Sequence, residues 1–297
     1  MNPKQNPKCP ACGAGSWKIG LSKTSHQRYK CPKCGRKFDE RDGTPFHRLR
    51  KPEKALLVAT VLYTNYPLSS YQVKEIVGLF GIDVSARQIE RWPERFGPSV
   101  KRIFRKYKIR FSKVWHVDEK FVPHDRVPSP KRKRGEKKWL YQITVLDSKN
   151  NVVASFLAEE RNTEAAKKVL RRAKETAGFS PDFIVSDDCP IYDKGVNVLG
   201  RRTKHVTAHF EGKLMPHGKG VVLLSNNRIE RYNSTLAPKV RSMRGVKSAE
   251  RGDMFFQVYN FMHNFSRKGR MKRILGRLGL KLGWDGLTKL FHLARDF

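Results

Sequence analysis

The ten residues from Lys113 to Val122, KVWHVDEKFV, are the stretch around which the chain is organised. Their valines and aromatic side chains are typical of a buried β-strand. Asp118 lies in the middle of this run. A charge at such a position is costly to bury unless something compensates it. Asp118 is therefore expected either to be paired with a basic group or to hold a cation.

Two further carboxylates lie where similar patterns end or begin. The run FIVSDD, residues 183–188, stops a second strand-like segment on Asp187, and NNRIER, residues 226–231, opens a helix that carries Glu230. Taken singly, each acid is equally well explained as a surface or salt-bridged carboxylate. Together, three acids from two strands and one helix can form an all-oxygen site of the kind that suits Mg²⁺ or Mn²⁺.

The segments WHVDE (115–119), SDDCPIY (186–192) and NNRIE (226–230) resemble, in order, the three acidic motifs of DDE-class insertion-sequence transposases, in particular those of the IS-six type. The resemblance implies an α/β catalytic domain with a ribonuclease-H-like fold. It also implies that Asp118, Asp187 and Glu230 are catalytic residues that bind magnesium or manganese. It selects Asp118 over Glu119, as does the alternation of side chains along a strand.

Composition predicts a polyanionic partner. Lysine and arginine total 62 against 27 aspartate and glutamate residues, which gives a net charge of +35. Double-stranded DNA is the leading candidate, and an anionic membrane surface is the weaker one because the basic residues are spread over the whole chain. No apolar stretch approaches the roughly 18 residues that span a bilayer, and the first residues lack the apolar core of a signal peptide. We expect a cytoplasmic, nucleoid-associated protein.

Four cysteines predict a zinc ribbon over residues 1–45. Cys9 and Cys12 form one Cys-x-x-Cys knuckle, and Cys31 and Cys34 form a second. This spacing suits a structural, tetrahedral Zn²⁺ site with no open position, whereas redox-active or unpaired thiols are the alternative. The residues between the knuckles include an aromatic side chain and several basic ones, which suit either contact with DNA or a partner, or simple solvation. They are Trp17, Lys18, Lys23, His26, Arg28 and Lys30.

A helix-turn-helix domain is predicted over residues 46–110. Two helices are expected at 52–63 and 69–80, the second with Tyr71 and Phe80 among its inner residues, and a short turn follows. Ser85-Ala-Arg-Gln88 has the form of a capping box, which starts a third helix that runs through Trp92. Ala86, Arg87, Glu90 and Arg91 are expected to face outward, with Arg87 and Arg91 as DNA contacts. A separate basic helix is expected at 99–110. An ordinary helical connector is the alternative.

The catalytic domain is predicted over residues 111–270. Strands are expected at 114–122, 139–147, 152–158, 183–185 and 202–206, with a helix at 163–177. This pattern alone indicates only a mixed α/β domain, and the ribonuclease-H-like assignment depends on the resemblance. Between the first two strands lies a basic segment that we expect either to contact DNA or to be a solvated loop tip. Its candidate DNA-binding residues are Lys131, Arg132, Lys133 and Arg134.

The chain departs from the family pattern after Glu230. Relatives usually carry a basic residue at the position of Ala237, and here Pro238 follows, which is expected to kink or restart the helix. This basic contact to DNA is expected either to be lost or to be supplied by Lys239, and Lys239 and Arg241 are candidate DNA-binding residues. Residues 209–219 look like an insertion that is tolerated as a loop. Residues 271–297 form a basic C-terminal tail, in which 284–294 is either a strap across a core or a dimer contact.

The resemblance implies a DNA transposase that binds terminal inverted repeats and target DNA. It also implies a homo-oligomer, at least a dimer, because two element ends must be handled together. Two other functions remain open from the sequence. One is a non-catalytic DNA-binding regulator derived from a transposase, and the other is a nuclease of the same fold that cuts without joining.

Overall fold

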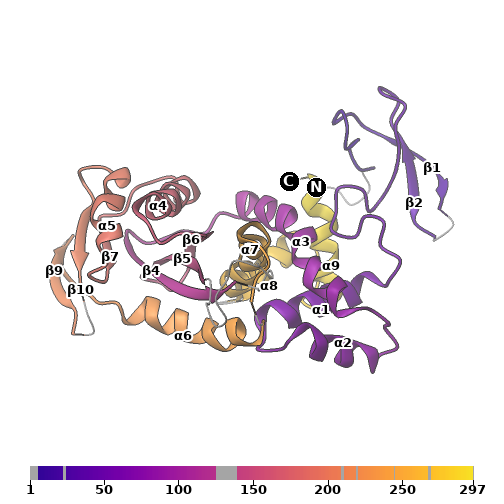
Figure 1. Cartoon of the computed structure of the whole chain (residues 1–297). Coiled ribbons are helices and arrows are strands. Elements are labelled where there is room, and N and C mark those ends of the chain that lie inside the picture. The colour runs from indigo at the N-terminus through magenta and orange to yellow at the C-terminus, as the bar shows by residue number, and fades with distance from the viewer. Residues whose placement is uncertain are drawn as a thin grey trace. The chain divides into compact units, whose positions relative to one another are not determined.

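A computed structural model describes residues 6–22, 25–124, 139–208, 211–218, 220–243, 245–266 and 269–296. The chain divides into two compact units (Figure 1). One comprises Met1–Leu62, Val73–Lys108 and Phe265–Phe297, and we call it the N-terminal unit. The other comprises Tyr63–Gln72 and Ile109–Asn264, and we call it the sheet unit.

The sheet unit contains a five-stranded sheet in the order β6-β5-β4-β7-β8. The first three strands are antiparallel neighbours, and β7 and β8 continue the sheet in parallel pairing. Their bounds are β4 Val114–Pro123, β5 Trp139–Asp147, β6 Val152–Ala158, β7 Phe183–Ser186 and β8 Lys204–Thr207. The mixed α/β class is confirmed, and the strand predictions agree with the structure to within two residues at each end.

Helices cover both faces of this sheet (Figure 1). On one face, α4 (Thr163–Ala177) packs its Ala165, Ala166, Val169, Leu170 and Ala173 stripe against the inward residues of β4 and β5. Asn162 caps its start, and Gly178, at φ 78°, ends it in the left-handed conformation that glycine adopts most easily. The short α5 (Pro190–Gly195) and the 3₁₀ turn Val196–Leu199 share this face.

The opposite face of the sheet carries α6 (Asn227–Ser242) and α7 (Ala249–Ser266). Tyr232 of α6 donates to Asn260 of α7 at 2.6 Å, and Asn260 donates to Ser155 of β6 at 2.8 Å. The helix α6 continues through Pro238 to Ser242, so the restart considered from the sequence does not occur. Its buried residues Ile229, Leu236 and Val240 hold both sides of the proline against the rest of the unit.

The segment expected to be an inserted loop instead forms a β-hairpin. β9 (Lys213–His217) and β10 (Gly220–Leu224) pair antiparallel. Alternate residues of the hairpin pack inward, since Met215, Val222 and Leu224 join a core with strand β7. The loop expectation was wrong because it considered only the length of the segment. The alternating burial of an apolar GVVLL run provides the driving force for a strand.

The N-terminal unit contains a three-stranded ribbon, several helices and the C-terminal segment, while the end of α1 and the start of α2 belong to the Tyr63–Gln72 segment of the sheet unit. The bounds are β1 Trp17–Leu21, β2 Gln27–Lys30, β3 Lys37–Asp39, α1 Glu53–Asn65, α2 Ser70–Gly78, α3 Ala86–Lys106, α8 Arg270–Arg277, α9 Trp284–Leu293 and a 3₁₀ turn Ala294–Asp296. In α9, Phe291 packs edge-on against Phe96 of α3 at 4.8 Å between ring centroids. The segment 284–294 is therefore a strap across this core.

The helix α3 differs from the prediction of two separate helices. It is continuous from Ala86 to Lys106 and contains both Pro93 and Pro98. Each proline inside a helix costs about 3 kcal/mol because it removes a hydrogen bond and crowds the preceding turn. One unbroken buried stripe offsets this cost. It consists of Ile89, Trp92, Phe96, Val100 and Ile103.

The first two helices expected in the helix-turn-helix segment form as α1 and α2, and the third begins at its predicted cap, but some of the predicted faces are wrong. Both hydrogen bonds of the Ser85–Gln88 capping box form, and the expected outward residue Ala86 is buried. On α2, the predicted inner residues Tyr71 and Phe80 are 61% and 76% exposed. The helix α2 ends at Gly78, before Phe80, and among its described residues Val73 and Val77 face the core, whereas Tyr71 lies on another side of the helix.

Candidate active site and zinc site

Asp118 in β4 and Asp187, directly after the end of β7, lie near the same end of two paired strands. His116 of β4 pairs in parallel with Val185 of β7. Asp118 follows His116 by two residues, and Asp187 follows Val185 by two residues. Extending the register by two positions therefore sets the two carboxylates at the same level of neighbouring strands, which lie about 4.8 Å apart. The negative charge of Asp187 contributes to the raised pKa of Asp118, which is consistent with this proximity.

Helix α6 brings the third acid to the same face of the sheet. Asn233 donates from Nδ2 to Asp118 Oδ2 at 2.8 Å. Glu230 precedes Asn233 by three residues, so it lies on the same side of α6 and is half-buried. Among the described residues, the three acids do not form a group in which all ligand oxygens lie within 4.8 Å of one another. The structure thus brings the aspartates together and sets Glu230 on the adjoining helix.

Asp118 lies in an environment that disfavours its charge. Burial raises the pKa of its carboxyl from 3.8 to about 7, and the charges of Glu119 and Asp187 contribute further. Hydrogen bonds from the Glu119 backbone N–H, at 2.7 Å, and from Asn233 partly offset the rise in pKa. In the described part of the chain, no basic side chain forms an ion pair with Asp118. A buried carboxylate without a basic partner suits a bound cation.

Glu119, the neighbour of Asp118, has a structural role. It points to the opposite face of the sheet, where Arg161 donates from Nε at 2.5 Å and Tyr192 donates from its hydroxyl at 2.6 Å. Its carboxylate is buried and fully engaged in these bonds. This arrangement follows from strand alternation and supports the choice of Asp118 as the first acid.

Asp187 is held by the turn that ends β7. Its Oδ1 accepts the backbone N–H of Cys189 at 3.2 Å. Its carbonyl accepts the hydroxyl of Ser186 at 2.8 Å, and Ser186 Oγ also lies 2.7 Å from His205 Nε2. Asp188, the alternative second acid, is exposed. Burial raises the pKa of the Cys189 thiol, which disfavours a thiolate nucleophile at that position.

Asn233 and Ser186 are residues beside the acids that sequence reasoning did not single out. Asn233 donates a hydrogen bond to Asp118, which is far away in the chain, and Ser186 donates one to the backbone carbonyl of Asp187. The position of Asn233 on the Glu230 face of α6 was the one available signal, because residues three apart on a helix share a side.

Lys239 is not a DNA contact, contrary to the prediction. Its side chain is 2% exposed, and its Nζ donates to the Leu68 carbonyl at 2.7 Å. The ammonium also lies 4.2 Å from the ring centroid of Tyr63 and 5.5 Å from that of Phe255. Burial lowers the pKa of Lys239 from 10.5 to about 7. This lysine therefore attaches the Tyr63–Gln72 segment to helix α6.

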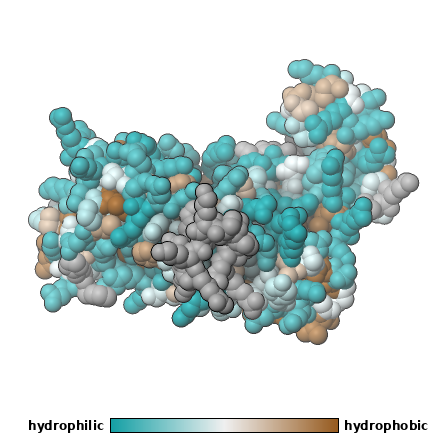
Figure 2. Space-filling view, viewed as in Figure 1, coloured by the Kyte–Doolittle hydropathy of each residue, from teal (hydrophilic) through white to brown (hydrophobic). Residues whose placement is uncertain are grey.

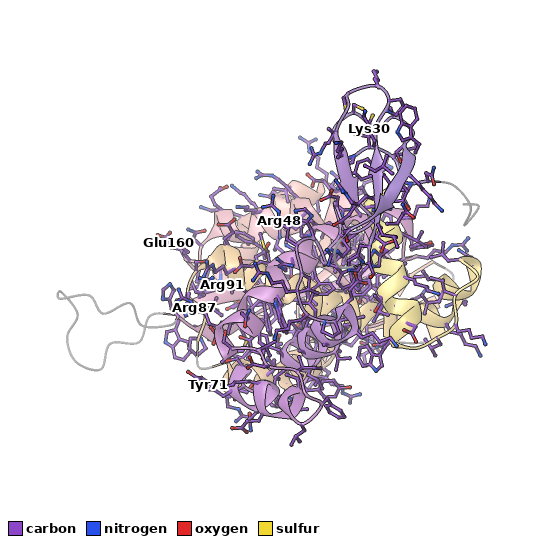
Figure 3. All side chains as sticks on the ribbon, turned by 90° about the vertical axis from the view of Figure 1, so that its right-hand side faces the viewer. Lys30, Arg48, Tyr71, Arg87, Arg91 and Glu160 are labelled. Carbon is purple, nitrogen blue, oxygen red and sulfur yellow. The ribbon has the colours of Figure 1, made fainter. Side chains whose placement is uncertain are left out.

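The other predicted DNA-binding residues fall into two groups. Arg87 and Arg91 are exposed on α3, one turn apart, and both are labelled in Figure 3. Arg241 is exposed at the end of α6. The residues predicted in the basic segment, Lys131, Arg132, Lys133 and Arg134, lie outside the described residues.

The four cysteines of the ribbon converge. Their Sγ atoms all lie within 4.8 Å of one another, with Cys12 3.5 Å from Cys31 and Cys9 3.6 Å from Cys34. Thiolates at about 2.3 Å from a tetrahedral Zn²⁺ are separated by about 3.8 Å, so the arrangement fits that ion. The knuckles close in the same way, because Gly13 and Gly35 donate to the carbonyls of Cys9 and Cys31 with φ near 70°.

Comparison with known proteins gives the family. A family model described as a DDE domain matches residues 112–269, which is more than half of the chain. The chain belongs to the DDE-domain transposase family, in its IS-six type. Divalent-metal use is a property of this family. The region matched includes Asp118, Asp187 and Glu230, while the two ribbon knuckles lie before it.

The chain is similar to the transposase for insertion sequence-like element IS431mec of Staphylococcus aureus. The two are 22% identical over 135 residues, which cover 46% of this chain and 55% of that protein. The transposase for insertion sequence element IS257 in transposon Tn4003, also of Staphylococcus aureus, matches to the same extent. The chain thus spans about half the length of these curated relatives.

Among solved structures, the Mos1 transposase paired-end complex with left transposon end is similar over 82% of this chain and 77% of that chain. The identity is 11% and the TM-score 0.30. The simian T-cell lymphotropic virus intasome in complex with PP2A regulatory subunit B56 gamma matches 44% of this chain and 41% of that chain, at 16% identity and a TM-score of 0.30. None of the described helices has the combined length and hydropathy needed to cross a membrane.

Proposed function

We propose that this chain is a DNA transposase that binds the ends of its element and carries out divalent-metal-dependent cleavage and strand transfer. The observation that carries the proposal is the meeting of the two aspartates with the Glu230 helix. Asp118 and Asp187 each follow the last register pair of β4 and β7 by two residues, the charge of Asp187 contributes to the raised pKa of Asp118, and Asn233 of α6 donates a hydrogen bond to Asp118. The DDE family and the lack of a basic ion-pair partner for Asp118 among the described residues both support metal-dependent phosphodiester chemistry.

In the proposed reaction, Asp118, Asp187 and Glu230 hold Mg²⁺ or Mn²⁺ through carboxylate oxygens, the ligands these ions prefer. The bound ions supply activation of the attacking oxygen and stabilisation of the leaving 3′ oxygen. Water attacks the phosphorus at the element end, the phosphorus–O3′ bond breaks, and a free 3′-hydroxyl remains. That hydroxyl then attacks target DNA, with release of a target 3′ oxygen. Asn233 keeps Asp118 oriented throughout.

The remaining parts of the proposal concern binding. The four ribbon cysteines hold a structural Zn²⁺. Arg87, Arg91 and Arg241 contact double-stranded DNA at the terminal inverted repeats or the target, consistent with the net charge of +35. Hydrophilic side chains cover most of the face in Figure 2. We also propose a homo-oligomer of at least two chains, located on the nucleoid in the cytoplasm.

The test is cleavage and joining of DNA that carries the element's own termini, with Mg²⁺ or Mn²⁺ added. We expect Asp118→Asn, Asp187→Asn and Glu230→Gln each to reduce both steps by at least about a thousandfold, because each removes a ligand oxygen's charge. Asp188→Asn is the matched control and is expected to retain activity, since its side chain is exposed beside Asp187. Equal nicking by the wild type and Asp118→Asn would disprove the mechanism.

A non-catalytic DNA-binding regulator is the second candidate, and the burial of Lys239 favours it. This lysine does not replace the basic residue missing at Ala237, so a contact near the site that relatives usually have is absent at both positions. Such a protein would bind the element's termini with wild-type affinity and show no metal-dependent cleavage in any variant.

A further inference from the structure

The outer face of the ribbon sheet carries an aromatic side chain in register with two lysines. Trp17 of β1 pairs with Lys30 of β2, and Lys30 pairs with Lys37 of β3. Residues paired across antiparallel strands project from the same face, so these three side chains form one row across the sheet. We call Trp17, Lys30 and Lys37 the ribbon row; Lys30 is labelled in Figure 3.

The opposite face of the same sheet is the core of the ribbon. Tyr29 and Phe38 pair with each other there, with ring centroids 5.6 Å apart and planes inclined by 25°. Both pack with Cys9 and Cys31 beside the cysteine cluster. The stability of the ribbon therefore needs Tyr29, Phe38 and the metal ligands, whereas Trp17 faces away from that core.

Trp17 is 50% exposed, which is a large apolar area for a side chain without a core role. Within the described residues, no ion pair joins Lys30 or Lys37 to a carboxylate. The nearest acidic residue by register is Asp39, which pairs with Arg28, and its carboxylate accepts the Arg41 backbone N–H at 2.8 Å. The row thus presents one indole on the edge strand β1, next to two lysines on β2 and β3 that form no ion pair with a carboxylate among the described residues.

We propose that the ribbon row binds unpaired bases of a DNA strand, with a base stacked on Trp17 and the phosphates on one side of that base against Lys30 and Lys37. An indole face stacks on any base that is free of its own stack, and lysines neutralise the adjacent phosphates. A paired, stacked duplex offers no such face along its length. The ligand is accordingly a single-stranded segment, such as the one exposed when a DNA end is opened. The inference rests on the proposed DNA-binding function and narrows it.

The experiment measures binding of the zinc-loaded full chain to a fluorescent single-stranded oligonucleotide and to the duplex of the same sequence, without added divalent metal. Trp17→Ala is expected to weaken single-strand binding by roughly 5- to 150-fold, which is the loss of affinity when one base–aromatic stack is removed. The affinity for the duplex is expected to change little. Trp17→Phe is expected to restore most of the affinity. Trp284→Ala removes another exposed tryptophan and is the matched control.

The contribution of the two lysines is measured by the salt dependence of single-strand binding. Each of Lys30→Gln and Lys37→Gln should reduce the slope of log affinity against log salt by about 0.7 for the single strand. Lys33→Gln, an exposed lysine within a knuckle, is expected to leave single-strand affinity and this slope nearly unchanged. Indole emission should be quenched on binding in the wild type and less so in Trp17→Phe.

Three results would overturn the proposal: unchanged single-strand binding by Trp17→Ala, an equal loss for single strand and duplex, or no preference for Phe over Ala at this position. Zinc content and thermal unfolding of each variant show whether the ribbon remains folded. Because no step needs cleavage, the result is independent of the catalytic test. An inactive Asp118→Asn chain is still expected to bind single strands, and a chain without the ribbon-row site can still cleave.

Discussion

The Asp118 carboxyl shows how one residue's surroundings change its chemistry. Burial and two neighbouring carboxylates raise its pKa to about 7, and two hydrogen bonds only partly offset the rise. Between pH 3.8 and about 7 the folded chain therefore binds a proton at Asp118 that the unfolded chain has already released. Where the folded state binds more protons, stability falls as pH rises. The charged form of Asp118 therefore lowers the free energy of unfolding.

We predict that Asp118→Asn stabilises the chain at pH 8 by on the order of 2 to 4 kcal/mol in metal-free buffer, because it removes the buried charge. The gain should disappear as the pH falls through the window from about 7 to 3.8. Denaturant unfolding of both proteins at a series of pH values measures it. Asp188→Asn should show no such gain, and a destabilised Asp118→Asn at pH 8 would contradict the assignment.

Lys239 gives the opposite dependence on pH. Burial lowers its pKa from 10.5 to about 7, so between these values the unfolded chain holds more protons and stability rises with pH. We predict that the unfolding free energy of the wild type rises relative to that of Lys239→Met between pH 7 and 10.5. Met fills a similar volume without a charge. A pH-independent difference between the two proteins would show that the ammonium is not desolvated.

At the scale of elements, the burial of an apolar stripe keeps α3 helical despite the low helix propensity of its two prolines. Pro98 is exposed within this helix and is not among its buried residues. We predict that Pro98→Ala stabilises the chain by about 1 to 3 kcal/mol, because it restores a helix hydrogen bond and relieves crowding. Denaturant unfolding measures the change. Pro93→Ala should gain less, since Pro93 is buried in the packed face, and an equal gain at both sites would contradict this account.

At the scale of the whole molecule, the two units have different sources of stability. The ribbon's own core consists of Cys9, Tyr29, Cys31 and Phe38, with Ala14 packed at its edge, and such a core is too small to hold a fold without a metal. The five-stranded sheet has an extended apolar core on its α4 face.

We therefore predict that Cys31→Ser loses the bound zinc, measured by elemental analysis, and unfolds the ribbon. Amide hydrogen exchange should become fast over residues 9–39 and stay slow in β4, β5 and α4 of the sheet unit. Zinc binding and slow ribbon exchange in Cys31→Ser would show that this thiolate is not a required ligand. Cys189→Ser is the control, because that buried cysteine lies outside the cluster.

Local patterns predicted much of this architecture. Strands β4, β5 and β6 and helix α4 have strong periodicity and distinct ends, and the Ser85 capping box depends only on residues close in sequence. The convergence of cysteines follows from two short turns of the same kind. The exposure of Tyr71 and Phe80 and the hairpin at 213–224 were not predictable in this way, because they depend on which surfaces the rest of the chain supplies.

The amino-acid sequence by itself determined the order of the three acids, the two Cys-x-x-Cys knuckles, the basic composition and the strand in which Asp118 and Glu119 face opposite ways. These features depend on residue identity and on spacings of a few residues. Only the tertiary structure decided that Asn233 joins the Glu230 helix to Asp118, that Glu119 is engaged by Arg161 and Tyr192, and that Lys239 is buried against Leu68. The physical reason is that burial and hydrogen-bond partners come from segments far apart in the chain, and their competition for the same space is settled only when the whole core packs.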